Sequence, residues 1–352
     1  MDPISQGVVG ITAAQCISQR KQLITASAAG LLAGMAPDLD ILIRSSNDPI
    51  LLLEFHRQFT HSLLFIPIGG LICAVFFYWL VGFFQRPRVI NFQQTYLYST
   101  IGYATHGLLD ASTSYGTQLF WPLSHQRVAW NNIAVIDPLF TLPLIALVIM
   151  ALLRRKKYWA YLAAIYALSY LGFGLYQEHR AYQTALSLAQ SRGHTPIQLN
   201  VKPSFANQLV WKSIYQFKDQ YYVDGLYMST TPRYFPGTTI AKLKLAESFP
   251  WLQANSQQAK DIERFRWFSS DHLAVDPYDS HRIIDIRYSM LPQSIKGLWG
   301  ITLSPEAELD EHVGWVTHRS IEQRQQDMTI LWQMIRGQHS QALPNAAQDL
   351  PQ

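Results

Sequence analysis

The segment Ser62–Phe84 (SLLFIPIGGLICAVFFYWLVGFF) contains 23 residues and no charged side chain. A helix of this length is about 34 Å long, which is enough to cross the hydrocarbon core of a bilayer. Tyr158–Tyr176 is a second apolar segment of this kind. Leu139–Leu153 is shorter, and Leu23–Ala36 and Tyr96–Ala111 are less apolar. The first half of the chain therefore predicts an α-helical membrane domain of about five spanning helices.

Basic residues beside these segments predict an orientation in the membrane. Lys and Arg are enriched on the cytoplasmic side of membrane spans. Arg154–Lys157 lie between two apolar segments, Arg86 and Arg88 follow the longest one, and Arg20 and Lys21 precede the first. All three groups agree on one orientation. The segments expected outside the cytoplasm are 37–61, 111–138 and the chain after residue 177.

The second half of the chain has the composition of a water-soluble domain. Runs rich in β-branched and aromatic residues predict strands at Val210–Phe217, Tyr221–Met228, Ile283–Leu291, Leu298–Leu303 and His312–His318. Helices are expected at Glu178–Ser191, Thr239–Ser248 and Ile321–Ile335. The expected domains are a membrane domain at 1–177, a soluble extracytoplasmic α+β domain with an antiparallel sheet at 178–336, and a disordered tail at 337–352.

Charge and cysteine content argue against several classes of protein. The net charge of +4 is small and spread along the chain, so we expect no nucleic-acid partner. Cys16 and Cys73 lie far apart in apolar segments, which disfavours a disulfide framework and a cysteine zinc site. The N-terminus lacks the basic start and the cleavage site of a signal peptide, so we expect it to be retained.

The ionisable residues of the first half that are candidates for a functional site lie in four short stretches. These are Ala36–Asp40 (APDLD), His56–His61 (HRQFTH), His106–Asp110 (HGLLD) and Asp137–Pro138. Each stretch adjoins the end of an apolar segment, and the orientation derived from Lys and Arg places all four on the outer face. Ionisable groups in or beside a membrane span are costly, and they are functional candidates for that reason.

The spacing within these stretches suits a shared metal ion. His106 and Asp110 are four residues apart, so one helical face presents both an imidazole and a carboxylate. Asp38 and Asp40 alternate, so an extended backbone after Pro37 would point both side chains the same way. The expected metal ligands are Asp38, Asp40, His56, His61, His106 and Asp110. Such a mixed set of nitrogen and oxygen donors suits Zn²⁺, with Mn²⁺ as the next choice.

A metal in this position would support hydrolysis. It lowers the pKa of bound water and polarises an ester or phosphoryl oxygen. Asp38 or Asp40, if not committed to the metal, can act as a general base or orient a ligand imidazole. Arg57 and Arg127 are candidates for gripping an anionic substrate such as a phosphate. Thr60 can cap the long helix, which would leave His61 on its first turn.

Each feature also has a structural explanation. A DxD sequence after Pro is commonly a turn or a helix cap, and Asp137 before Pro138 can simply cap the next helix. Arg57 can pair with a neighbouring Asp, and Arg127 can meet lipid headgroups. The HxxxD pair at 106–110 is harder to explain in this way, because burying both groups in a membrane span is costly.

The order of these motifs resembles a known family, the membrane-bound metal-dependent hydrolases related to the LexA-binding inner-membrane hydrolases (domain of unknown function 457). The matching features are MDP at the N-terminus, AGMAPDLD at 33–40, HRQFTHSLL at 56–64, HGLLD at 106–110, YGTQLFWPLS at 115–124 and IDP at 136–138. The resemblance covers residues 1 to about 180. It implies a bacterial inner-membrane protein in which the six ligands named above hold a divalent metal.

One position departs from the pattern of that family. Many members have His where this chain has Gln6. Either Gln6 is a weaker oxygen ligand, or the metal has one ligand fewer, or the activity is altered.

The sequence leaves three functions open. The first is a metal-dependent hydrolase of a phosphoester or another ester, and membrane lipid or a lipid-linked substrate suits a site at helix ends. The second is a non-catalytic membrane scaffold with a structural metal. The third is an ion or solute transporter, which fits less well because transport sites usually lie near the bilayer midplane. The residues specify neither the substrate nor the oligomeric state.

Overall fold

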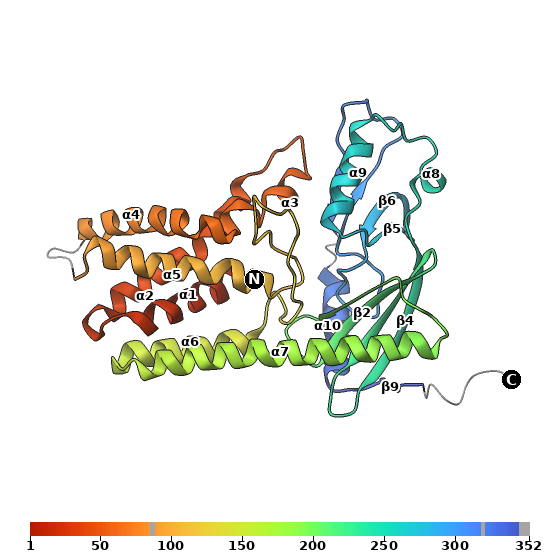
Figure 1. Cartoon of the computed structure of the whole chain (residues 1–352). Coiled ribbons are helices and arrows are strands. Elements are labelled where there is room, and N and C mark those ends of the chain that lie inside the picture. The colour runs from red at the N-terminus through yellow and green to blue at the C-terminus, as the bar shows by residue number, and fades with distance from the viewer. Residues whose placement is uncertain (85–88, 318–320, 345–352) are drawn as a thin grey trace. The chain divides into compact units, whose positions relative to one another are not determined.

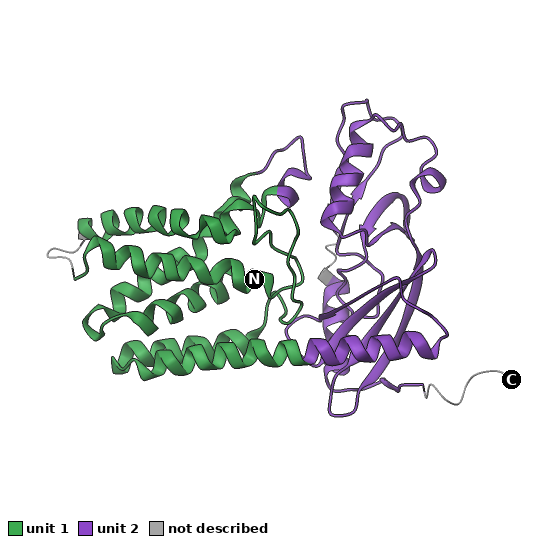
Figure 2. Cartoon of the chain, viewed as in Figure 1, with its two compact units in different colours: residues 1–43, 55–176 green, residues 44–54, 177–352 purple. Residues whose placement is uncertain are grey.

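The chain forms two compact units, one helical and one rich in strands (Figures 1 and 2). The residues that the computed structural model describes are 1–84, 89–317 and 321–344. The two units are 1–43 with 55–176 (unit 1) and 44–54 with 177–352 (unit 2). The short segment 44–54 therefore groups with unit 2, although the chain on both sides of it belongs to unit 1.

Unit 1 is built mainly from helices, with a long loop between Ala111 and Pro138. Its helices are α1 (Pro3–Ile17), α2 (Leu23–Met35), α4 (Ile66–Phe84), α5 (Phe92–Ala111), α6 (Pro138–Arg154) and the first part of α7 (Tyr158–Ser191). Its 3₁₀ helices are η1 (Arg20–Gln22), η2 (Ala36–Leu42), η3 (Phe59–His61) and η4 (Leu63–Phe65). Helix α3 (Leu51–Phe55) contains the point in the chain where segment 44–54 of unit 2 ends and unit 1 resumes. Local signals set several starts: Asp2 caps α1, Asn91 and Gln94 form a capping box on α5, and Asp137 caps α6.

The expectation of about five membrane-spanning helices is wrong. Among the described residues, two helices are long and apolar enough to cross a membrane, Leu63–Phe83 and Tyr158–Ser191. Helix α2 has 13 residues and α6 has 17, so both fall short of the roughly 20 residues of a typical membrane span. Helix α5 has 20 residues, but its buried positions include Thr95, His106 and Asp110, which lower its hydropathy.

Glycines bring α1, α2 and α5 into close contact. A Cβ atom added to Gly30 of α2 would lie 2.4 Å from the carbonyl oxygen of Gly10 in α1. One added to Gly102 of α5 would lie 2.8 Å from the carbonyl oxygen of Gly30. Small residues at such crossings let helix backbones approach closely. This packing sets α5, which carries His106 and Asp110, directly against α2.

Unit 2 contains two antiparallel sheets rather than the one expected. The first has the order β1-β2-β3-β4-β9, with β1 (Gln198–Pro203), β2 (Val210–Phe217), β3 (Gln220–Tyr227), β4 (Arg233–Ala241) and β9 (Gln341–Ala342). The second has the order β5-β6-β7-β8, with β5 (Leu273–Asp276), β6 (Asp279–Asp285), β7 (Trp299–Thr302) and β8 (Gly314–Thr317). The helices are α8 (Leu245–Ser248), α9 (Gln257–Phe268), α10 (Ile321–Ile335) and the end of α7.

The two faces of strand β2 bury different cores. Trp211 packs with Leu226 of β3 against Ala185 of α7. Ile214 lies on the opposite face, because side chains alternate along a strand, and it packs against Ile284 of the second sheet. The first sheet is therefore covered on both faces, which explains why almost every side chain of β2 is buried.

Three expectations for unit 2 need correction. The strand expected at Ile283–Leu291 is β6, which begins at Asp279 and ends at Asp285. The helix expected at Thr239–Ser248 begins only at Leu245, because its first residues belong to β4 and pair with β3. Within the expected tail, Gln341–Ala342 pair with β4 as strand β9. The rest of that tail, from residue 345, lies outside the described residues.

One arginine holds segment 44–54 in unit 2. Arg264 of α9 donates to both carboxylate oxygens of Glu54, at 2.8 Å each, and to those of Asp48, at 3.0 and 2.9 Å. It also donates to Asp261 at 2.8 Å. Bidentate pairs between Arg and carboxylates fix geometry as well as charge. The segment therefore has a defined place in unit 2.

We expect Arg264→Ala to release segment 44–54. The loss of these charge-assisted hydrogen bonds should lower the free energy of unfolding of unit 2 by about 2 kcal/mol, since the arginine is mostly buried. Amide hydrogen exchange of the segment should accelerate. Arg266→Ala is the matched control, because Arg266 of the same helix pairs with Glu263 and Asp271 instead. Equal exchange of the segment in both variants would contradict the assignment.

Candidate metal centre

Two histidines and two aspartates from three segments of unit 1 converge on one point. One donor atom from each of Asp38, His61, His106 and Asp110 lies within 4.8 Å of the other three. Asp38 lies on η2, His61 on η3, and His106 and Asp110 one turn apart on α5. All four belong to the ligand set expected from the sequence.

The distances within this cluster match those between ligands of one ion. His61 Nε2 lies 2.9 Å from His106 Nε2, 3.5 Å from Asp38 Oδ1 and 3.2 Å from Asp110 Oδ2. His106 Nε2 lies 3.3 Å from Asp38 Oδ1 and 3.6 Å from Asp110 Oδ2. Four atoms in tetrahedral geometry about a Zn²⁺ ion at about 2.0–2.1 Å lie about 3.3 Å from one another. The observed separations scatter around this value.

Hydrogen bonds on the far side of each imidazole direct its Nε2 lone pair into the cluster. His106 Nδ1 lies 2.6 Å from the carbonyl oxygen of Gly34, which can only accept, so Nδ1 carries the hydrogen. His61 Nδ1 lies 2.9 Å from Thr60 Oγ1 and 3.2 Å from Asp40 Oδ2. Two neutral imidazoles held in this way present two lone pairs 2.9 Å apart. Only a proton or a cation between them relieves the repulsion.

The charge of the cluster also favours a cation. Burial alone would raise the pKa of Asp38, but His106 and His61 hold it below its usual range. Burial would lower the pKa of His61, yet the carboxylates of Asp110, Asp38 and Asp40 outweigh this and raise it to about 10. His61 therefore carries a proton at neutral pH unless a cation replaces it. Metal binding at this site must displace that proton.

Asp40 orients the cluster from behind. Its Oδ2 accepts from the backbone N–H of Arg57 at 3.0 Å and from Thr60 Oγ1 at 2.8 Å, and its Oδ1 lies 2.7 Å from His56 Nδ1. With the contact to His61, both carboxylate oxygens are occupied. Asp40, Asp38 and His56 also place one donor each within 4.8 Å. Sequence spacing alone did not distinguish Asp40 from the other residues that were expected to bind the metal.

Local backbone structure differs from two expectations. Asp38 and Asp40 lie on the 3₁₀ helix η2, not on an extended strand, because Pro37 at its start favours a helical turn. Thr60 does not cap α4. Ser62 is the capping residue of the turn that leads into it, and its side chain accepts from the N–H of Phe65. His61 consequently precedes the long helix and points back to the cluster.

Arg57 is buried beside the ligands. Its φ of 66° lies in the left-handed region, which is uncommon for a residue other than glycine and clusters at functional sites. Its Nη1 donates to Thr113 Oγ1 at 2.9 Å, and its Nε lies 3.0 Å from Asp110 Oδ2. With 5% of its surface exposed, Arg57 forms an ion pair with a ligand carboxylate. This position suits orientation of Asp110 better than capture of a substrate from solvent.

Three further residues considered in the sequence, Gln6, Arg127 and Asp137, lie in different places. Gln6 is fully buried and donates from Nε2 to Asp110 Oδ1 at 2.7 Å, where the amino group of Met1 also makes contact. Arg127 donates to the carbonyl oxygen of Gly116 at 2.9 Å. Asp137 accepts from the first N–H groups of α6 and from the Tyr170 hydroxyl, away from the cluster. Gln6 thus holds a carboxylate of the cluster in place, and Asp137 is a helix cap.

Tyr115 brings Arg127 near the cluster, a relation that the spacing of the sequence did not suggest. The guanidinium carbon of Arg57 lies 4.7 Å from the centre of the Tyr115 ring, and that of Arg127 lies 5.2 Å from it. The ring of His56 is 5.8 Å from the same tyrosine. Tyr115 is the first residue of the YGTQLFWPLS motif. Its contacts with the two arginines depend on the fold and could not be inferred from the motif.

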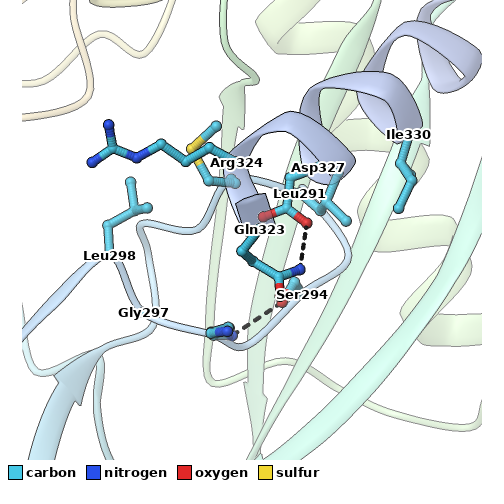
Figure 3. Close-up of a pocket in the computed structure, with 10 residues that line it drawn as sticks. Leu291, Ser294, Gly297, Leu298, Gln323, Arg324, Asp327 and Ile330 are labelled. Atoms are coloured by element: carbon cyan, nitrogen blue, oxygen red, sulfur yellow. Dashed lines mark hydrogen bonds between the residues drawn. The ribbon is translucent and has the colours of Figure 1, made fainter. Parts of the chain in front are cut away.

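Other candidate sites in the described residues are weaker. Asp48, Asp261 and His312 of unit 2 place donors within 4.8 Å, but Arg264 already pairs with both carboxylates. A cavity of about 280 Å³ lies between α10 and the loop before β7, with Arg324 among its lining residues (Figure 3). Its lining contains none of the residues that the sequence singles out.

Comparison with known proteins identifies the family of the helical half. Residues 1–181 match the family model described as YdjM inner membrane protein. Inner membrane protein YbcI of Escherichia coli (strain K12) is 31% identical over 111 residues, which are 30% of this chain. The chain spans 60% of the length of that curated relative. No solved structure matches the chain.

The matched residues make up just over half of the chain and include the whole His/Asp cluster. The expected membership in an inner-membrane family is confirmed, whereas the hydrolytic activity implied by the resemblance stays a prediction. The chain belongs to the YdjM inner membrane protein family.

Proposed function

We propose that this inner-membrane protein is a metal-dependent hydrolase of a phosphoester or another ester, with membrane lipid or a lipid-linked compound as its substrate. The observation that carries the proposal is the convergence of Asp38, His61, His106 and Asp110 at distances suited to one Zn²⁺ or Mn²⁺ ion. A divalent cation held there polarises an ester or phosphoryl oxygen and lowers the pKa of bound water.

The remaining polar residues suit the other tasks of hydrolysis. Asp38 keeps 20% of its side chain exposed and His56 keeps 17%, so substrate approaches from their side. His56, oriented by Asp40, is placed to move a proton to or from the reacting group. Arg57 positions Asp110. Arg127, which contacts the Tyr115 ring, adds positive charge for an anionic substrate.

Metal analysis of the purified full-length protein tests the proposal. We expect about one equivalent of Zn²⁺ or Mn²⁺ per chain, and hydrolysis of at least one member of a panel of esters and phosphodiesters. Chelation should abolish that hydrolysis and added metal should restore it. A protein that holds metal but leaves the panel untouched would argue for a different function.

A structural role for the metal is the second candidate. Four protein donors around one point are typical of closed structural zinc sites, whereas catalytic zinc sites keep one position open. Exchange of Zn²⁺ for Mn²⁺ separates the two roles, because Mn²⁺ prefers six ligands and would leave positions for water and substrate. Activity that depends on which ion is bound supports catalysis, and unchanged thermal stability without the ion argues against a structural role.

His56→Ala distinguishes proton transfer from metal binding. If His56 acts as general acid or base, the variant retains its metal while kcat falls by about 10²–10⁴-fold. Metal content and kcat measured on the same sample decide the point. Loss of the metal together with activity would instead identify His56 as a ligand, as the sequence pattern predicts.

We further propose that the cluster and unit 2 face the extracytoplasmic side. Arg154–Lys157 precede α7, and Arg86 and Arg88 follow α4, so the positive-inside rule places these helix ends in the cytoplasm. The start of α4, next to His61, and the chain after α7 then lie on the opposite side. We expect a C-terminal reporter enzyme that folds only outside the cytoplasm to be active. A fluorescent protein that matures only in the cytoplasm should stay dark, and the reverse pattern would refute this orientation.

A further inference from the structure

An apolar groove lies directly beside the metal centre in unit 1. Its volume is about 540 Å³, within the range of small-molecule binding sites. It is formed by the end of α2, by η2, by the turns before α4 and by one face of α4 itself, with Tyr103 of α5 at its side. Ile72 and Phe76 line it from α4, and Leu32 and Leu39 from the opposite wall.

The position of the groove on α4 indicates that a hydrocarbon chain would occupy it. The helix belongs to one of the two candidate membrane spans, Leu63–Phe83. Ile72 is 59% exposed and Phe76 is 55% exposed, so this face is left to the surrounding medium. The lining runs from Phe65 to Phe76, about 17 Å along the helix axis at 1.5 Å per residue. That length is close to half of the hydrocarbon core of a bilayer, the depth of one leaflet.

The polar end of the groove is shared with the metal centre. Thr60 lines the groove, and its hydroxyl donates to Asp40 and contacts His61 Nδ1. Leu39 lines it too, while its two neighbours in the chain, Asp38 and Asp40, belong to the cluster. The turn η2 thus presents carboxylates to the metal site and an apolar side chain to the groove.

We propose that this groove holds one acyl chain of a membrane lipid and places the ester or phosphoester of its headgroup at the metal centre. The inference rests on the proposed hydrolytic function for the reaction, but the binding of the chain stands on the groove alone. Tyr103 keeps the end of the groove in place, since its hydroxyl donates to the carbonyl oxygen of Thr60 at 2.7 Å.

Photocrosslinking of the full-length protein tests the groove without relying on activity. The protein is placed in vesicles of phosphatidylethanolamine and phosphatidylglycerol that contain a trace of phosphatidylethanolamine with a photoreactive diazirine on one acyl chain. We expect crosslinks to concentrate on residues that line the groove. Ile72→Trp, which fills it, should lower them by about 10-fold or more, because a misfit of even one methylene in an apolar pocket costs about that much. Leu71→Trp is the matched control, because Leu71 lies on α4 and is 45% exposed but does not line the groove.

Activity measured on the same variants separates the two proposals. With metal bound, Ile72→Trp should lose hydrolysis of long-chain lipid esters and keep hydrolysis of a short water-soluble ester with the same headgroup. Two results would refute binding of an acyl chain in the groove: crosslinks spread evenly along α4, or crosslinks equally strong in the Ile72→Trp and wild-type proteins. Concentrated crosslinks without hydrolysis of any ester overturn the proposed function and leave the lipid-binding groove standing.

Discussion

His106→Ala should remove the bound metal and lower hydrolysis by about 10³-fold or more. The variant deletes one of two imidazoles whose Nε2 atoms lie 2.9 Å apart, and it opens a gap at a fully buried position of the cluster. A catalytic metal contributes several kcal/mol of transition-state stabilisation, and each 1.36 kcal/mol changes the rate tenfold. Elemental analysis and single-substrate kinetics on one preparation measure both effects. Combining the change with Asp110→Asn should reduce the metal content no further.

His125→Ala is the matched control for that experiment. His125 is an exposed histidine of the same unit and has no place in the cluster. This variant should keep its metal and its rate. Insertion into the membrane and thermal unfolding of both variants show whether the fold survives. Full metal occupancy in a folded His106→Ala, Asp110→Asn protein would rule out the proposed ligand set.

The sequence predicts the members of the cluster well because their spacing carries chemical information. His106 and Asp110 share a helical face by periodicity alone, and a buried pair of this kind has few structural explanations. The division of roles was not predictable in the same way. Asp38 and Asp40 differ by two positions in one 3₁₀ helix, and only contacts such as that from Thr60 to Asp40 distinguish the surroundings of the two carboxylates.

The number of spanning helices was overestimated for a physical reason. Apolar segments such as Leu23–Ala36 resemble membrane spans in composition, but an apolar helix can also be buried by its neighbours. Ala26, Ala29 and Ala33 of α2 are almost fully buried against other helices of unit 1. Length decides the matter for a helix of 13 residues, since it reaches only about 20 Å.

The partner of segment 44–54 could not be predicted from the sequence. Its sequence, RSSNDPILLLE, reads as a turn followed by a short helix, and nothing in it specifies a partner more than 200 residues away. The partner is Arg264, which lies on a helix that the sequence did not predict. Pairing of a carboxylate with a distant arginine depends on the fold of the whole unit. Strand β2, by contrast, is encoded locally by its β-branched and aromatic residues and was predicted with its observed bounds.

Gly30→Ala should destabilise unit 1 by more than about 3 kcal/mol. The added methyl group would lie 2.4 Å from the carbonyl oxygen of Gly10 and 2.7 Å from the Cβ atom of Ala14, and the backbone of α1 cannot turn aside as a flexible side chain could. Overpacking of this kind costs about 1–3 kcal/mol where side chains can adjust, and more where they cannot. Thermal unfolding in detergent measures the loss.

The same substitution should weaken metal binding from a distance. His106 is oriented by the carbonyl oxygen of Gly34, one turn beyond Gly30 on α2, so moving α2 away from α1 shifts the group that orients this imidazole. Gly172→Ala is the matched control, because no atom lies within 4 Å of the added methyl group and alanine favours helix α7 by about 0.5–1 kcal/mol. If both variants unfold at the same temperature, the close approach of α1 and α2 is not what holds the metal centre together.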